Sequence, residues 1–150
     1  LIYDDEQLPI MFPGGWVLDR GRDWRDGATR CLVFSPAVSM FDGYEQTEVK
    51  LQVTTKAVLV EAQSNIDISY PGQGLGVDGA ELVPFEAGLV SERVIHTMRP
   101  VQTAMAGGER LTVALGFWPS WPVTKTQQAS LSLDGFKPAY AALQSCAAQH

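Results

Sequence analysis

Cysteine and histidine are scarce in this sequence, with two residues of each among 150. Neither cysteine has a partner at the C-x-x-C or H-x₃-H spacing that zinc sites use, so no metal site is predicted. His150 is the terminal residue, and His96 has no nucleophile near it in sequence, so we expect His96 to be a structural residue at a strand end. No G-x-S-x-G motif is present. The sequence therefore predicts a protein that is not an enzyme, with no catalytic residue and no cofactor.

Positive charge is also in short supply, because 11 Lys and Arg residues against 17 Asp and Glu residues give a formal net charge of −6. The densest basic group alternates with acidic residues, so we expect its field largely to cancel. Its members are Asp19, Arg20, Arg22, Asp23, Arg25, Asp26 and Arg30. Nucleic acids and anionic membrane surfaces attract basic patches, so neither is predicted as a partner. No apolar run approaches the roughly 20 residues of a membrane span.

The two cysteines that are present bracket the chain. Cys31 lies near the start and Cys146 near the end. They could be two unrelated buried thiols, since a free cysteine packs like a small apolar residue. We favour a disulfide, because closing a loop of about 115 residues stabilises a fold by roughly 4–5 kcal/mol in the chain-entropy treatment. Disulfides persist mainly in oxidising compartments. The chain starts at Leu1 and not at Met, which we interpret as an exported chain whose signal peptide has been removed.

The pattern of apolar residues predicts one mostly β domain. Residues 48–54 alternate apolar and polar side chains most clearly, and residues 57–62 follow as a hairpin partner. Further strands are expected at 16–18, 30–34, 65–69, 111–118 and 129–133, with a tight hairpin over 75–85. Residues 1–15, which contain two prolines, a Gly-Gly pair and the acidic run 4–6, are expected to be an extended N-terminal arm. Residues 16–150 are expected to form the single domain.

Near the end of the chain, apolar residues recur at the spacing of a helix and no longer alternate as in a strand. Phe136, Tyr140, Leu143 and Ala147 recur at helical spacing as one apolar stripe and predict a terminal helix over residues 136–148. Cys146 falls on the same side of this helix, which would dock it against the strand that carries Cys31. The predicted fold is therefore an antiparallel β-sandwich or barrel with one C-terminal helix.

Residues 131–143, Leu-Ser-Leu-Asp-Gly-Phe-Lys-Pro-Ala-Tyr-Ala-Ala-Leu, carry a recognisable motif. This segment resembles the closing S-L-x-G-F-x-x-A signature of the invasion-associated locus B family. Residues 74–79, Gly-Leu-Gly-Val-Asp-Gly, resemble the turn motif of that family. The resemblance covers residues 16–146 and implies a bacterial periplasmic, or otherwise exported, envelope protein built on a β-sandwich. It implies no reaction. The chain departs from the family at residues 85–88, where no cysteine stands.

Two loops and the acidic arm are the predicted contact surfaces. The first loop holds Trp118, Pro119 and Trp121, which could form a rigid aromatic contact surface or could cap the open end of the core. The second loop holds Tyr70 and Gln73 within the glycine-rich run 71–76. No helix is expected after this run, so a turn is a better interpretation than a nucleotide site. The acidic run 4–6 lacks calcium-site spacing and is expected to be solvated.

Two functional hypotheses follow. The first is a non-enzymatic envelope protein that binds a protein partner, as an inhibitor, an immunity factor or an accessory factor. The alternative is a small-ligand-binding or carboxylate-dependent hydrolytic envelope protein, in which carboxylates from different segments converge in a cleft.

Overall fold

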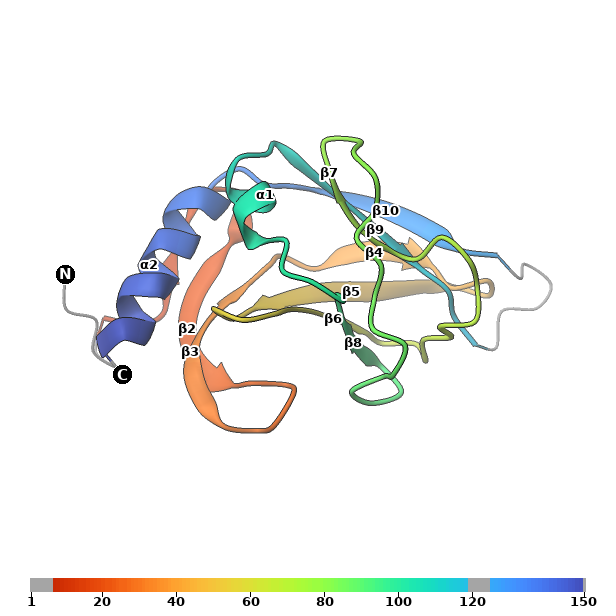
Figure 1. Cartoon of the computed structure of the whole chain (residues 1–150), viewed down its shortest axis with the longest axis horizontal. Helices are drawn as coiled ribbons and strands as arrows, with labels where there is room; N and C mark the ends of the chain where they lie inside the picture. The colour runs from red at the N-terminus through yellow and green to blue at the C-terminus, as the bar shows by residue number, and fades with distance from the viewer. Residues whose placement is uncertain (1–6, 119–124, 150) are drawn as a thin grey trace.

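The computed structural model of the chain describes residues 7–118 and 125–149 and consists of two antiparallel sheets with a C-terminal helix (Figure 1). The larger sheet has the order β1-β2-β3-β5-β6-β8, and β4 pairs with β5 beside it. Its strands are β1 (Ile10–Met11), β2 (Val17–Arg22), β3 (Thr29–Phe34), β4 (Val38–Phe41), β5 (Gln46–Val53), β6 (Val58–Ala62) and β8 (Val94–His96). The smaller sheet, in the order β10-β9-β7, contains β7 (Gly74–Val77), β9 (Arg110–Leu115) and β10 (Gln127–Ser132).

Neither sheet closes on itself, so the fold is the sandwich and not the barrel of the two predicted architectures. A 3-10 turn, η1 (Pro13–Gly15), precedes β2, and two α-helices, α1 (Gln102–Ala106) and α2 (Phe136–Gln149), follow β8 and β10. Among the described residues, no helix is both long enough and apolar enough to cross a membrane.

The β5–β6 hairpin forms because one face of β5 is apolar. Val49, Leu51 and Val53 are fully buried. Of the two residues between them, Lys50 is exposed and Gln52 is buried. Pairing of Val49 with Ala62 and of Val53 with Val58 sets the register. Because side chains alternate across a strand, this register places Val49, Leu51 and Val53 on the core face with Val58, Val60 and Ala62, while Leu59 pairs with Gln52 on the other face. The predicted strand pair is confirmed.

The core between the layers brings a residue near the start of β2 into contact with residues around the start of α2. Trp16, just before β2, is fully buried, and its ring meets that of Phe136 edge-on with 4.9 Å between centroids. The Trp16 indole N–H also donates a hydrogen bond to the Ser132 carbonyl at 3.1 Å. A buried indole usually needs such a partner. These contacts hold β2, β10 and the start of α2 together.

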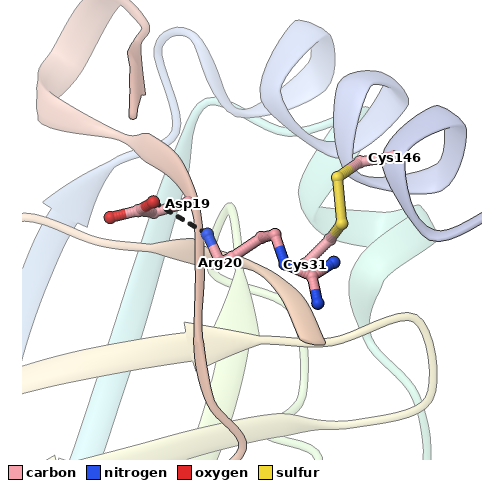
Figure 2. Close-up of a disulfide and its surroundings, with 4 residues drawn as sticks. All are labelled: Asp19, Arg20, Cys31 and Cys146. Carbon is pink, nitrogen blue, oxygen red and sulfur yellow. Dashed lines mark hydrogen bonds between the residues drawn. A yellow bond between two sulfur atoms is a disulfide. The ribbon is translucent and has the colours of Figure 1, made fainter. Parts of the chain in front are cut away.

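Helix α2 lies against β2 and β3 and is joined covalently to β3 (Figures 1 and 2). Its buried face consists of Phe136, Ala139, Ala142, Leu143 and Cys146. The Cys31–Cys146 disulfide has a Cα–Cα distance of 6.1 Å, and both cysteines are buried. The predicted helix and the predicted disulfide are confirmed. Of the predicted apolar stripe, Phe136 and Leu143 are buried and Tyr140 is partly buried, whereas Ala147 is exposed.

Three local expectations differ from the structure. Residues 65–69 do not form a strand, because only Ile66 makes a β-bridge, to Phe117. In the expected hairpin over 75–85, β7 instead pairs with β9 along its length, and a single Leu75–Val83 bridge remains across the turn. Within the expected arm, Ile10 and Met11 form β1, which pairs with β2 and so belongs to the larger sheet.

Candidate binding surface

Trp118 stands at the end of the segment that follows β9, with its side chain turned away from the core. The preceding residue, Phe117, is buried and bridged to Ile66, and adjacent residues of an extended chain point to opposite sides. Trp118 is consequently 62% exposed. Its backbone N–H donates to the Asn65 carbonyl at 3.0 Å, so the backbone under the exposed ring is held in place.

Two open grooves meet at Trp118, and together we call them the Trp118 surface. The first, of about 550 Å³, is lined by Asp42, Tyr44, Glu45, Gln63, Ser64, Asn65, Arg93 and Trp118. The second, of about 330 Å³, is lined by Asn65, Ile66, Asp67, Ile68, Leu89, Glu92 and Trp118. Four of its large apolar or aromatic side chains are exposed, namely Tyr44, Ile68, Leu89 and Trp118. Exposed apolar residues gathered beside polar ones are typical of contact surfaces.

Asp42 shapes the turn that carries Tyr44. Its Oδ1 accepts backbone N–H bonds from Tyr44 at 2.8 Å and Glu45 at 2.9 Å, and its Oδ2 accepts the Ser64 hydroxyl at 2.7 Å. Burial alone would raise the pKa of Asp42, but these hydrogen bonds outweigh it and the pKa is lowered. An ionised Asp42 therefore holds the β4–β5 turn, with Tyr44 59% exposed at its tip.

Asn65 connects the two grooves. Its carbonyl accepts the Trp118 N–H, and its side-chain oxygen accepts the Arg93 Nε–H at 3.1 Å. Arg93 is exposed, so its guanidinium keeps donors available to a partner. The lining residues include four carboxylates and this one arginine, which leaves the Trp118 surface with a formal charge of −3.

The second predicted loop is joined by hydrogen bonds to Asp67 and Gly116, next to this surface. The Gln73 amide group donates to the carbonyls of Asp67 at 2.7 Å and Tyr70 at 3.0 Å, and its oxygen accepts the Gly116 N–H at 2.8 Å. Tyr70 covers Gly116 so closely that a Cβ there would lie 2.3 Å from the tyrosine ring. Tyr70 and Gln73 thus fasten the 67–73 turn to the segment that leads to Trp118. Pro119 and Trp121 lie outside the described residues.

Sequence reasoning found Trp118 but not its neighbours. Tyr44, Asn65 and Arg93 come from three other segments, and only the sheet pairing brings them to one groove. The one local signal was the Asp-Gly turn before Tyr44, which predicts a turn but not what the turn contacts.

His96 is the one histidine among the described residues. The His96 ring nitrogen Nδ1 hydrogen-bonds the adjacent Thr97 carbonyl at 3.1 Å. Within residues 7–118 and 125–149, no group of three or more His, Cys, Asp or Glu side chains is placed to hold a metal ion.

Fold and surface together define a class, namely a disulfide-linked β-sandwich domain with an exposed acidic and aromatic surface. Comparison with protein-family models, with curated proteins and with solved structures found no match.

Proposed function

We propose that this protein is a non-enzymatic bacterial periplasmic or envelope protein that binds another protein through the Trp118 surface, as an inhibitor, immunity or accessory factor. The observation that carries the proposal is Trp118 itself. Its ring is 62% exposed although its backbone is hydrogen-bonded and its neighbour Phe117 is buried. A large aromatic side chain on a fixed backbone contributes contact area at little entropic cost, which is why Trp is enriched among the residues that dominate binding energy.

The charge of the surface indicates the chemistry of the partner. The Trp118 surface has a formal charge of −3 and the whole chain has −6, so a basic protein surface is attracted to it. A Lys or Arg side chain of the partner can lie over the Trp118 ring in a cation–π contact while neighbouring carboxylates pair with further cations. The expected partner is thus a protein whose contact surface carries Lys or Arg beside apolar residues.

The disulfide supports the proposed compartment. The Cys31–Cys146 bridge is buried and joins the helix to the sheet, and such structural disulfides persist in oxidising compartments such as the periplasm. The resemblance of residues 131–143 to the invasion-associated locus B family points the same way.

The hydrolytic alternative needs a carboxyl group that stays protonated near neutral pH. The carboxyl groups with shifted pKa values in the described part of the chain, those of Asp23, Asp26 and Asp42, are all shifted downward. Hydrogen bonds from Arg30 lower the pKa of Asp26 to about 2. These groups suit electrostatic contacts better than proton donation, which favours a binding role.

The test begins with the oxidised protein as bait in an envelope extract, after which each captured protein is purified and titrated against defined variants. Trp118→Ala is expected to weaken binding by at least about tenfold, as for a central interface residue. Its melting temperature should stay within about 2 °C of wild type, since the ring packs little against the core. Affinity should also fall as NaCl is raised, because the partner is basic.

Met98→Ala is the matched control, because Met98 is 57% exposed and does not line either groove. It should change the affinity less than twofold. Equal affinities for Trp118→Ala and Met98→Ala would contradict the proposal, and so would a lower melting temperature of Trp118→Ala with unchanged binding.

A further inference from the structure

A separate cavity of about 430 Å³ lies where three segments meet. These are the β2–β3 hairpin, the turn between β5 and β6, and the last turn of α2. Its walls include the disulfide residue Cys31 and the helix residue Ala147, and four cationic side chains line it: Arg20, Arg25, Arg30 and Lys56. The volume falls within the range of small-molecule sites.

The charge of this cavity is opposite to that of the molecule. Four of the eleven Lys and Arg residues of the chain line it, and Asp26 is the one acidic residue among its lining. Asp23 pairs with two of the arginines but has no exposed side-chain surface. Arg20 has an interaction of its own, so the count is made without it: Arg25, Arg30 and Lys56 against Asp23 and Asp26 leave a formal charge of +1. A chain of net charge −6 thus concentrates positive charge at one concave site.

The two carboxylates hold the arginines in fixed positions. Asp23 accepts Arg25 Nε at 3.1 Å and Nη2 at 2.7 Å, and it accepts Arg30 Nη1 at 3.0 Å. Asp26 accepts the same Arg30 Nη1 at 2.7 Å. Within the described residues, no hydrogen bond uses Arg25 Nη1 or the Nε and Nη2 of Arg30. Each guanidinium is therefore anchored at one side and keeps donors for a ligand.

Buried polar side chains keep the cationic turns in place. Gln52, which is fully buried in β5, accepts the Trp24 N–H at 3.0 Å and donates to the Arg22 carbonyl at 2.9 Å. It thereby ties the end of the β2–β3 hairpin to the sheet. In the β5–β6 turn, Thr54 Oγ1 accepts the Lys56 N–H at 3.0 Å. Both turns are thus fixed before any ligand arrives, which lowers the entropic cost of binding.

The disulfide completes the cavity. Arg20 pairs across the strands with Cys31, and Figure 2 shows its guanidinium beside the Cys31–Cys146 bridge. The bridge holds the last turn of α2 against β3, where Ala147 closes one side of the cavity.

We infer that this cavity binds a compact oxyanion of the phosphate or phosphate-monoester class. Arginine forks bind phosphate oxygens in pairs, and Lys56 adds a point charge from the opposite turn. Phosphate monoesters are largely dianionic at neutral pH and so are attracted to this positive site. This inference depends on residues that do not line the Trp118 surface, so the two proposals stand or fall separately.

The experiment is an NMR titration of the oxidised full chain with inorganic phosphate and with glycerol phosphate at constant ionic strength. Saturable shifts are expected at the amides of Thr29, Lys56 and Ala147, one from each wall. Lys56→Gln should weaken phosphate binding by about fivefold, because it removes one charge-assisted contact from a partly solvated site. Lys50→Gln, which removes the same charge from an exposed position of β5 outside the cavity, should change it less than 1.5-fold.

Several outcomes would overturn the inference. These are shifts that do not saturate, equal effects of Lys56→Gln and Lys50→Gln, and saturable shifts with citrate but not with phosphate. Co-sedimentation with phosphatidic-acid vesicles without binding of either soluble phosphate would also overturn it. Melting curves of both variants check that the fold is retained, and since neither lysine side chain makes a hydrogen bond among the described residues, both variants are expected to fold.

Discussion

Asp23 shows how a single residue can carry charge into the interior of this protein. Its side chain has no exposed surface, and burial by itself would raise its pKa. Hydrogen bonds from Arg25 and the charges of Arg25 and Arg30 outweigh that effect, so the pKa is lowered and Asp23 is ionised at neutral pH. The two guanidiniums keep the Asp23 carboxylate ionised, and the carboxylate in turn offsets their positive charge.

Asp23→Asn should therefore be costly. Asparagine keeps the size of the side chain but removes the charge that two arginines need, and breaking a buried ion pair on one side costs more than removing the whole pair. Because both arginines are partly exposed, we expect the free energy of unfolding to fall by about 2 kcal/mol at pH 7, below the range for fully buried pairs. Urea denaturation measures this change.

Asp26→Asn is the matched control, because Asp26 pairs with Arg30 but is half exposed. Solvent screens exposed pairs, so a much smaller loss is expected. An Asp23→Asn protein as stable as Asp26→Asn at pH 7 would show that the buried carboxylate is not what holds the hairpin end.

The basic residues near Asp23 also show where local sequence reasoning stops. Their alternation with aspartates predicts a cancelled field, and two of the aspartates do pair with arginines. The positive excess at the cavity arises because Lys56 approaches from a different hairpin. Likewise, alternation of Phe117 and Trp118 in an extended segment predicts opposite orientations but not which of the two faces the core. Contacts between segments far apart in the sequence decide both.

At the scale of elements, the spacing of apolar residues and the two cysteines made much of the fold predictable. The two-residue period of β5 predicts its hairpin with β6, and the helical spacing from Phe136 to Leu143 predicts α2. The hairpin predicted over 75–85 is reduced to one bridge, and the glycines that precede it serve close packing. A Cβ on Gly74 would lie 2.4 Å from the Val83 carbonyl oxygen. Strand β7 can therefore pass close beside residue 83 while it pairs mainly with β9, a long-range partner that local pattern does not reveal.

The disulfide is the covalent contact between α2 and the sheet, so its removal should act on the whole element. The double variant Cys31→Ser, Cys146→Ser frees a loop of 115 residues in the unfolded chain. In the chain-entropy treatment, this lowers the free energy of unfolding by about 4–5 kcal/mol. Guanidinium denaturation should show the loss, and hydrogen exchange should show lower protection in the last turn of α2 than in β5.

Wild-type protein under reducing conditions is the comparison for the double variant. It should denature at nearly the same midpoint, because both proteins lack the same cross-link. If the double variant matches oxidised wild type, then the contacts of Phe136 and Leu143 hold α2 without the bridge, and the disulfide has little part in stability.

For the whole molecule, the acidic groups set how stability depends on pH. The pKa values of Asp23, Asp26 and Asp42 in the folded protein lie below their ordinary value of 3.8, and that of Asp26 is about 2. A group whose pKa is lower in the folded state stabilises the fold above its unfolded pKa, and this stabilisation is lost as the pH falls through the folded pKa. The three groups act in two distant places, at the end of the β2–β3 hairpin and in the β4–β5 turn.

The free energy of unfolding from these groups should thus be nearly constant from pH 7 to about pH 5 and then fall between about pH 4 and pH 2. Urea denaturation of the oxidised protein across this range measures the slope. The double variant Asp23→Asn, Asp42→Asn should start from a lower stability at pH 7 and lose less of it on acidification, because two of the three shifted groups no longer titrate. Glu48→Gln, which removes a carboxylate from an exposed position of β5, should follow the wild-type curve. A wild-type protein that becomes more stable between pH 4 and pH 2 would mean that relief of repulsion among the acidic groups outweighs the hydrogen bonds and ion pairs that hold these three carboxylates.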